Sequence, residues 1–307
     1  MTGRIVEIAQ DGRSVHLERG FLAVREGSET VGRVALDDVD AVLATTHGVV
    51  WSNRVLAALS ERGAPVVILG ADYAPAAALL PMRGHHDQGR RMRAQAEASR
   101  PVRKRLWAEL VRAKITAQID ALETLGHDAG RLRRLRSEVR SGDPDNREAA
   151  AAQAYWPILM GRDFRRDRNA GGVNAMLNYG YAILRAGAAR AIVAAGLHPA
   201  LSLHHVSDGD ALALADDVME PFRPAVDLIA HSLAQGGATM DERETKGALV
   251  AVLAADIRTE VGRTPLAQVM VRLCQNMAAS FCRASGERDR GLCLPASCLP
   301  VLPELDL

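Results

Sequence analysis

The chain has 307 residues, of which 48% are hydrophobic and 24% are charged, which is the composition of an ordinary globular protein with ample core. The formal net charge of +1 argues weakly against a protein that coats nucleic acid over its whole surface. No apolar run is long enough to span a bilayer, and the opening MTGRIVEIAQ lacks the pattern of a signal peptide. We therefore expect a cytoplasmic protein with no membrane contact and, from its length, two domains.

Residues 1–82 are predicted to form a small β-rich domain. Short segments rich in Val, Ile and Leu are separated by turn residues: RIVEIA, SVHLER, FLAVRE, VGRVAL and VVILG. One helix should interrupt them, with Ser52 as its N-cap and Gly63 as its end.

Residues 83–100 are interpreted as a charged linker, and residues 101–285 as an α-helical domain. Leu106, Leu110 and Ile115 begin a helical apolar spacing. Further helices are predicted at 145–160, 172–195, 208–220, 224–234, 242–258 and 264–284. Residues 286–307 contain three prolines and no periodicity, so we expect an extended or mobile tail. The predicted fold class is α+β, a small N-terminal β-rich domain followed by a larger all-α domain.

The stretch 203–224, LHHVSDGDALALADDVMEPFRP, carries the most chemical information. On a helix, Asp217 and Glu220 share a face, and Asp216 and Glu220, four residues apart, can also face together. His205 lies just upstream, so an imidazole and carboxylates can converge on one point. Such a mixed nitrogen and oxygen site suits Mg²⁺ or Mn²⁺.

A second acidic position is Glu148, and each acidic position also has a purely structural interpretation. The acidic residues can instead form an exposed helix face with a local ion pair to Arg223. Glu148 opens an alanine-rich helix, and Asp145 three residues earlier resembles the start of a capping box. Glu148 then either faces its own helix start or faces across to His205 and Glu220.

An asparagine- and glycine-rich segment, 165–201, precedes that stretch. Asn169, Asn174 and Asn178 can orient a site or meet phosphates, or they can satisfy a buried turn. Arginine clusters at 83–105, 131–140 and 161–168 are either solvated helix faces or phosphate-gripping surfaces, since a guanidinium binds phosphate through two parallel hydrogen bonds.

Two segments together resemble the CRISPR-associated spacer integrase family, the adaptation endonuclease that is the first-named Cas protein, in its type II-like branch. They are NAGGVNAMLNYGYAILRA and AAGLHPALSLHHVSDGDALALADDVMEPFRP. The resemblance extends to LWAELVRAKITAQIDAL, NREAAAAQAYWPILMGRDFRRD and WSNRVLAALSERGAPVVILG, and so covers residues 4–280.

The resemblance implies a metal-dependent DNA endonuclease and integrase that inserts captured DNA into a CRISPR repeat array, an antiviral adaptation. By position, Glu148, His205 and Glu220 would be the catalytic metal ligands for Mg²⁺ or Mn²⁺, with Asp217 as a secondary acidic residue. A 3′-hydroxyl of the incoming DNA would attack a repeat phosphodiester by transesterification. No ATP is needed, which agrees with the lack of a Walker loop in the sequence.

The same resemblance implies partners and DNA contacts. The protein would be a homodimer, with the N-terminal domain in the dimer interface, and two dimers would flank a dimer of the small second adaptation protein. Double-stranded and branched DNA would be bound, and the RNA-guided effector nuclease is a further candidate partner. The arginines expected to hold the DNA backbone are Arg165, Arg166 and Arg168 near the site, and Arg90, Arg91 and Arg93 farther along the DNA path. The alternatives are a non-catalytic DNA-capturing scaffold and a transposition-type integrase that acts outside CRISPR.

Overall fold

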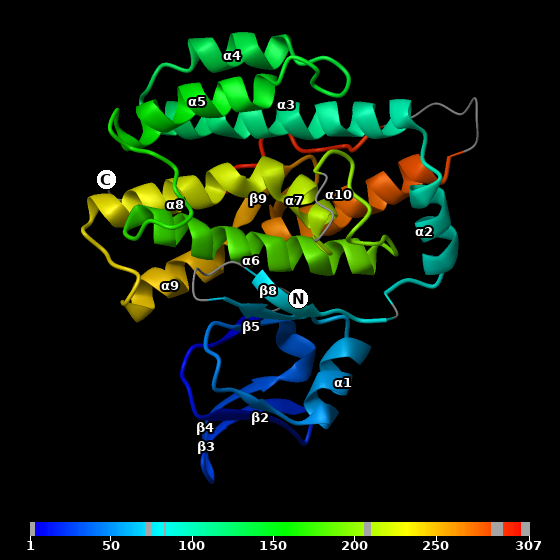
Figure 1. Ribbon diagram of the computed structural model, residues 1–307, viewed down its shortest axis with the longest axis vertical. Helices are drawn as coiled ribbons and strands as arrows, with labels where there is room; N and C mark the ends of the chain where they lie inside the picture. Colours follow the sequence, from blue (N-terminus) through cyan, green and yellow to red (C-terminus); the bar gives the residue numbers. More distant parts are fainter. Residues whose placement is uncertain (1–3, 71–74, 83, 206–209, 284–290, 302–307) are drawn as a thin grey trace.

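The computed structural model describes residues 4–70, 75–82, 84–205, 210–283 and 291–301. A β-rich region at the N-terminus is followed by a helical region, and the two are stacked along the long axis of the molecule (Figure 1). The predicted fold class is therefore confirmed. Among the described residues, no helix combines the length and the apolarity that crossing a lipid bilayer would require.

Two four-stranded sheets make up the N-terminal region. One sheet has the order β1-β5-β7-β8, with only β8 antiparallel, and consists of β1 Arg4–Ile8, β5 Val39–Ala44, β7 Val66–Leu69 and β8 Pro75–Leu79. The other has the order β4-β3-β2-β6 and consists of β2 Arg13–Glu18, β3 Phe21–Glu26, β4 Glu29–Ala35 and β6 Val50–Trp51. A cluster of buried Val, Leu, Ile and Ala side chains joins them to α1, Asn53–Glu61.

The helix predicted within this region is confirmed with its N-cap, because the Ser52 side chain accepts a hydrogen bond from the amide of Val55. Strand β5 was not predicted. It lies between β1 and β7, and five of its six residues are buried. A strand covered on both faces lacks the alternation of polar and apolar residues that marks a half-exposed strand.

The helical region is built in layers around α6. Its helices are α2 Gln88–Ala96, α3 Arg100–Thr124, α4 Gly130–Ser137, α5 Arg147–Met160, α6 Val173–Ala194, α7 Ala213–Met219, α8 Arg223–Gln235, α9 Arg243–Val250 and α10 Leu266–Phe281. Helix α6 packs on β5 of the sheet and also on α7, α8 and α10, while α3 packs on α5 and α8 above it (Figure 1). An ion pair of 2.6 Å between Arg190 on α6 and Asp40 on β5 fixes the two regions to each other.

Three segments differ from the expected element boundaries. The segment 83–100, expected as a linker, contains α2, whose Gln95 is buried and bonds to the carbonyls of His198 and Leu201. The helix predicted over 242–258 ends early, and β9 Asp256–Thr259 pairs with β10 Gly262–Pro265 in a hairpin. The described part of the tail, 291–301, is irregular with a turn and a bend, and it packs on the helical region with Leu292, Cys298 and Leu299 buried.

Candidate active site

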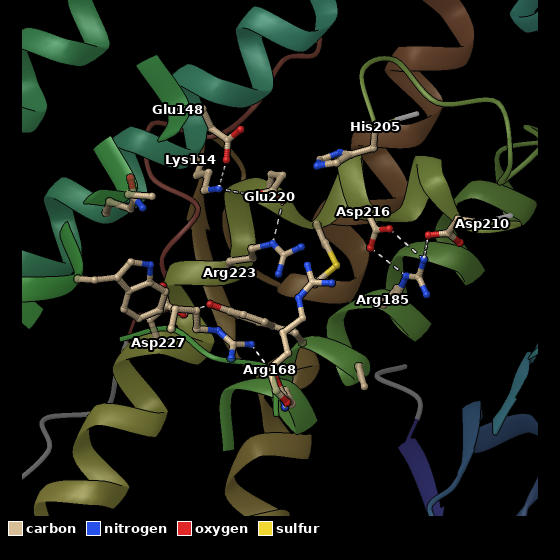
Figure 2. Close-up of a pocket in the computed structure, with 18 residues that line it drawn as sticks. Lys114, Glu148, Arg168, Arg185, His205, Asp210, Asp216, Glu220, Arg223 and Asp227 are labelled. Carbon is tan, nitrogen blue, oxygen red and sulfur yellow. Dashed lines mark hydrogen bonds and ion pairs between the residues drawn. The ribbon is translucent and has the colours of Figure 1, made fainter. Parts of the chain in front are cut away.

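A cavity with a volume of about 470 Å³ lies in the helical region between α3, α5, α6 and the junction of α7 with α8 (Figure 2). The three residues expected as metal ligands, Glu148, His205 and Glu220, all line it. They come from positions up to 72 residues apart, since Glu148 lies on α5 and Glu220 follows α7. The fold therefore brings their side chains to one space.

Glu220 owes its position to a break between two helices. Helix α7 ends at the residue before it, and one 3-10 turn, Glu220–Phe222, leads into α8. Pro221 has no amide proton to donate, so the α-helical hydrogen-bond pattern cannot run through it unchanged, although Glu220 itself keeps helical dihedrals (φ -52°, ψ -46°). Glu220 is only 3% exposed and its carboxylate is directed into the cavity. The alternative of an exposed acidic face is wrong for this residue.

A buried lysine connects the two glutamates. Lys114 comes from the middle of α3, and its Nζ lies 2.5 Å from Glu148 Oε1 and 2.5 Å from Glu220 Oε2. The other oxygen of Glu220, Oε1, accepts a hydrogen bond of 2.9 Å from Nε of Arg223. Figure 2 shows both carboxylates directed at the same ammonium group, with a dashed line from Lys114 to each. Two cations thus stabilise Glu220 in a place that excludes most water.

Glu148 stands at the start of α5, but it does not cap that helix. The side chain of Asn146 accepts from the amide of Ala149, and the carboxylate of Asp143 accepts from the amide of Glu148. Asp145 pairs with Arg140 at 2.8 Å instead of joining a capping box. The capping-box alternative is therefore wrong, and the Glu148 side chain is free to reach across to α3.

His205 is held by a carboxylate behind it. Asp217 is fully buried, and its Oδ1 lies 2.7 Å from Nδ1 of His205. The same carboxylate accepts hydrogen bonds from the backbone amides of Leu203, His204 and His205. Asp217 therefore fixes the loop and the imidazole together and leaves Nε2 as the ring nitrogen available to the cavity. The neighbouring His204 stacks on Trp107 with ring centres 4.3 Å apart.

The electrostatics of these groups follow from burial and pairing. Burial alone would raise the pKa of Glu220, but Arg223 and Lys114 outweigh it and lower this pKa from 4.5 to about 2. Burial likewise opposes the charge on Lys114, yet Glu220 and Glu148 raise its pKa above the usual value. The hydrogen bond that His205 donates to Asp217 raises the pKa of His205 against the opposing effect of burial. Both the glutamate and the lysine are consequently charged at neutral pH.

Arginines form much of the remaining wall. The guanidinium of Arg166 donates to Asn174 Oδ1 at 3.0 Å and to Asn178 Oδ1 at 2.6 Å, while Asn178 also donates to the carbonyl of Arg168. These two asparagines therefore position an arginine-bearing loop at the cavity. Of the roles that the sequence left open for them, this is the one of orienting a site. Arg165 is exposed, does not line the cavity, and donates to backbone carbonyls in its own loop.

The arginines of α2 lie elsewhere. Arg90 pairs with Asp87 at 2.8 Å, and Arg93 is exposed. Arg91 donates to the carbonyl of Ala195 at 2.7 Å, so this arginine fastens α2 to the end of α6. None of the three lines the cavity.

Two further sets of charged residues line the cavity. Arg185 on α6 pairs with Asp216 at 2.9 Å and with Asp210 at 2.5 Å, so the Asp216 carboxylate faces α6, whereas the helical spacing had allowed it to face together with Glu220. Asp227 on α8 accepts a hydrogen bond from the hydroxyl of Tyr181. Burial raises the pKa of Asp227 to about 7, against the lowering effects of Tyr181 and Arg223.

The donor set has the chemistry that a divalent ion requires. Two carboxylates and an imidazole supported by a buried carboxylate suit Mg²⁺ or Mn²⁺. Glu220 Oε2 is buried without a hydrogen bond of good geometry, because its contact with Lys114 is ionic only. Across the described ranges, no three His, Cys, Asp or Glu side chains lie close enough to hold an ion by themselves. The space between Glu148 and Glu220 holds the Lys114 ammonium group instead.

Lys114, Arg185 and Asp227 were not among the residues predicted for the site. A signal for Lys114 exists in the sequence, because it lies on the face of α3 that carries Val111, Ile115 and other apolar residues. A charged residue on such a face needs a buried partner of opposite charge. Nothing in the local sequence identifies that partner, since both glutamates belong to other helices.

Known proteins similar to this chain agree with the expected family. A sequence model described as "CRISPR associated protein Cas1" matches residues 6–261. The CRISPR-associated endonuclease Cas1 of Neisseria meningitidis is 40% identical over 77% of this chain and 78% of its own length. A second relative, CRISPR-associated endonuclease Cas1 2 of Pyrobaculum aerophilum, is 29% identical over 90% of this chain and 99% of its own.

Solved structures show the same fold at lower identity. A casposase bound to integration product superimposes with a TM-score of 0.78 at 19% identity, over 93% of this chain and 92% of that one. A CAS1 protein from Thermotoga maritima gives a TM-score of 0.76 at 17% identity, over 93% and 100% of the two chains. The Neisseria relative fits the type II-like branch expected from the sequence motifs. On the family model and the 40% identical relative, this chain belongs to the CRISPR-associated Cas1 family.

Proposed function

We propose that this protein is a metal-dependent DNA endonuclease and integrase that inserts captured foreign DNA fragments as new spacers into a CRISPR repeat array. The observation that carries the proposal is the convergence of Glu148, Glu220 and His205 on one arginine-lined cavity. Its support from relatives lies in their names, CRISPR-associated endonucleases, and in a structural neighbour bound to an integration product.

The proposed reaction is a transesterification, in which a 3′-hydroxyl of the fragment attacks a repeat phosphodiester and another 3′-hydroxyl leaves. A bound Mg²⁺ or Mn²⁺, held by Glu148, His205 and Glu220, would supply a Lewis acid for the charge on the phosphate oxygens. The Asp217 carboxylate keeps the His205 ring in one orientation. One phosphodiester replaces another, so bond energy is nearly conserved and no nucleotide needs to be hydrolysed.

The arginines of the cavity would place the phosphate group. Arg166 and Arg168 face the space from the loop before α6, and Arg166 is aimed by Asn174 and Asn178. Guanidinium groups bind phosphate oxygens without reading bases, as suits a protein that accepts fragments of many sequences. Arg165, outside the cavity wall, and Arg90 and Arg93 on α2 would contribute backbone contacts farther along the DNA. Arg91, already engaged with the Ala195 carbonyl, would contribute least.

We propose the assembly on similar grounds. Solved structures with this fold include complexes named for Cas1 together with Cas2, and a Cas1–DNA complex. The proposed assembly has two homodimers of this chain around one dimer of the small second adaptation protein, with double-stranded and branched DNA as substrates. The RNA-guided effector nuclease is a further proposed partner, in the selection of fragments.

A strand-transfer assay tests the proposal. A labelled duplex and a repeat-bearing plasmid are incubated with the protein and its small partner, in Mg²⁺, in Mn²⁺ or in chelator. We expect joined products only with metal, and a loss of at least about a thousandfold in Glu220→Gln, while Glu29→Gln, an exposed control, behaves as wild type. DNA binding is measured in parallel by fluorescence anisotropy.

The outcomes separate the alternatives. A folded Glu220→Gln protein that binds DNA and integrates normally would identify a DNA-capturing scaffold and end the proposal. Equal integration into a plasmid without repeats would favour a transposition-type integrase over one that acts on a CRISPR array.

A further inference from the structure

The position of Lys114 is unusual for a lysine. Its side chain is 10% exposed, and its Nζ contacts two carboxylates that the proposed function needs for another cation. With Glu148 it makes a hydrogen bond, whereas its contact with Glu220 Oε2 has no hydrogen-bond geometry. One charged nitrogen therefore stands between two metal-ligand candidates.

Electrostatics explains why a cation must be there. Both carboxylates approach the same nitrogen to 2.5 Å, so without a positive charge between them they would repel in a region of low dielectric. Arg223 neutralises Glu220 from the far side through its Oε1 and does not reach between the two glutamates. Lys114 is the cationic side chain that both of them contact.

The chemistry of lysine suits an exchangeable cation. An ammonium group is a compact point charge at the end of a flexible four-carbon stem, whereas a guanidinium is held in a rigid fork. Lys114 can withdraw by rotating its stem, and the cavity it faces has a volume of about 470 Å³. Arginines in the lining of that cavity would favour an anion, and the carboxylates of Asp210, Asp216 and Asp227 in the same lining offer negative charge to a withdrawn ammonium group.

We propose that Lys114 is the resident counter-ion of the site, which holds Glu148 and Glu220 together before metal binds and must be displaced for metal to enter. Lys114 is thus a positioning residue that competes with the metal and keeps the apo site folded. The inference rests on the proposed metal site, and its test uses metal binding and amine reactivity instead of integration.

The first experiment measures Mn²⁺ binding to the full-length protein by isothermal titration calorimetry. Lys114→Met keeps the length of the side chain and removes the competing charge, so Mn²⁺ should bind at least about tenfold more tightly. Lys114→Arg keeps the charge and should bind no more tightly than wild type. Lys246→Met, the same substitution on α9 and outside the cavity, should leave the affinity unchanged.

Thermal unfolding gives a second reading of the same variants. In chelator, Lys114→Met should unfold at a lower temperature than wild type, because Glu148 and Glu220 lose the cation between them. Saturating Mn²⁺ should raise its unfolding temperature more than that of wild type. A purely structural salt bridge would lower stability in chelator without tightening metal binding.

The second experiment needs no variant and stands even if Lys114→Met does not fold. The chain contains only three lysines, Lys104, Lys114 and Lys246, so acylation of each by acetic anhydride can be followed by peptide mass spectrometry. Addition of Mn²⁺ should raise the labelling rate of Lys114 severalfold. The rates of Lys104 and Lys246 should change by less than twofold.

Failure of the inference and failure of the metal site give different results. If wild type and Lys114→Met bind Mn²⁺ with equal affinity, or if bound Mn²⁺ leaves Lys114 labelling unchanged, the inference is overturned and the metal site stands. If neither protein binds Mn²⁺ at all, both the inference and the proposed metal site are overturned.

Discussion

Replacement of Glu220 by glutamine gives a direct test of the buried charge network. The folded protein stabilises the ionised form of Glu220 through Lys114 and Arg223, and glutamine mimics the protonated form without the charge. The two cations keep other contacts in the variant, because Lys114 still meets Glu148 and Arg223 lies 4.5 Å over the ring of Tyr181. The loss should therefore be close to the free energy of ionisation alone.

That free energy follows from the pKa. A pKa lowered from 4.5 to about 2 corresponds to about 3 kcal/mol of stability at neutral pH. Since the folded-state pKa is the lower one, this stability is present above pH 4.5 and is lost as the pH falls towards 2. At pH 3 about 1.4 kcal/mol should remain.

Urea unfolding followed by circular dichroism at pH 7, 5 and 3 measures the difference. Glu220→Gln should be less stable than wild type by about 3 kcal/mol at pH 7 and by about half that or less at pH 3. Glu29→Gln is the matched control at an exposed position and should stay within about 0.5 kcal/mol of wild type. A difference that is the same at all three pH values would refute the reasoning.

Three further predictions follow from neighbouring groups. Asp217→Asn should lower the pKa of His205 towards its ordinary value, as measured by NMR titration of the ring; an unchanged titration would contradict the role of the hydrogen bond. Because the pKa of His205 is raised in the folded protein, its charged form stabilises wild type fully below pH 6.5, and this stability is lost as the pH rises through the folded-state pKa. The difference in unfolding free energy between wild type and Asp217→Asn should therefore shrink as the pH rises. Alanine at both Arg166 and Arg168 should reduce by about 2 the slope of the logarithm of the DNA-binding constant against the logarithm of salt concentration, measured by anisotropy between 50 and 200 mM NaCl. The same slope in the variant and in wild type would count against phosphate contacts. The buried Asp227 has its pKa raised to about 7, so wild type loses stability as the pH rises from 3.8 to 7, and Asp227→Asn should gain relative stability over that range in urea unfolding; a constant difference would show that burial does not control this carboxyl.

The fold was predictable where local sequence and burial agree. Short Val- and Leu-bearing segments bounded by turn residues, such as β2 and β3, could be identified from their composition, as could α1 with its Ser52 cap. Strand β5 could not, because both of its faces are covered. The hairpin of β9 and β10 was missed because the apolar period of α9 runs on into it, and only Gly262, with a φ of 105°, marks the turn.

The site was predictable only in part for a related reason. The family motifs predicted Glu148, His205 and Glu220 as metal ligands, and all three line one cavity, but helical spacing predicted the wrong neighbours for Asp216 and Asp217. Asp217 faces back to the 203–205 loop, and Asp216 faces Arg185, because α7 ends before Glu220. Contacts between helices, which decide such pairs, have no local signature in the sequence.

The most direct test of the central claim is the anomalous diffraction of Mn²⁺ in crystals of the full-length protein. One anomalous peak should lie in contact with Glu148, Glu220 and Nε2 of His205, with the Lys114 ammonium group moved out of the space between the two glutamates. A peak between Asp210 and Asp216 instead, or an unaltered Lys114 bridge with no peak in the cavity at saturating Mn²⁺, would contradict the account.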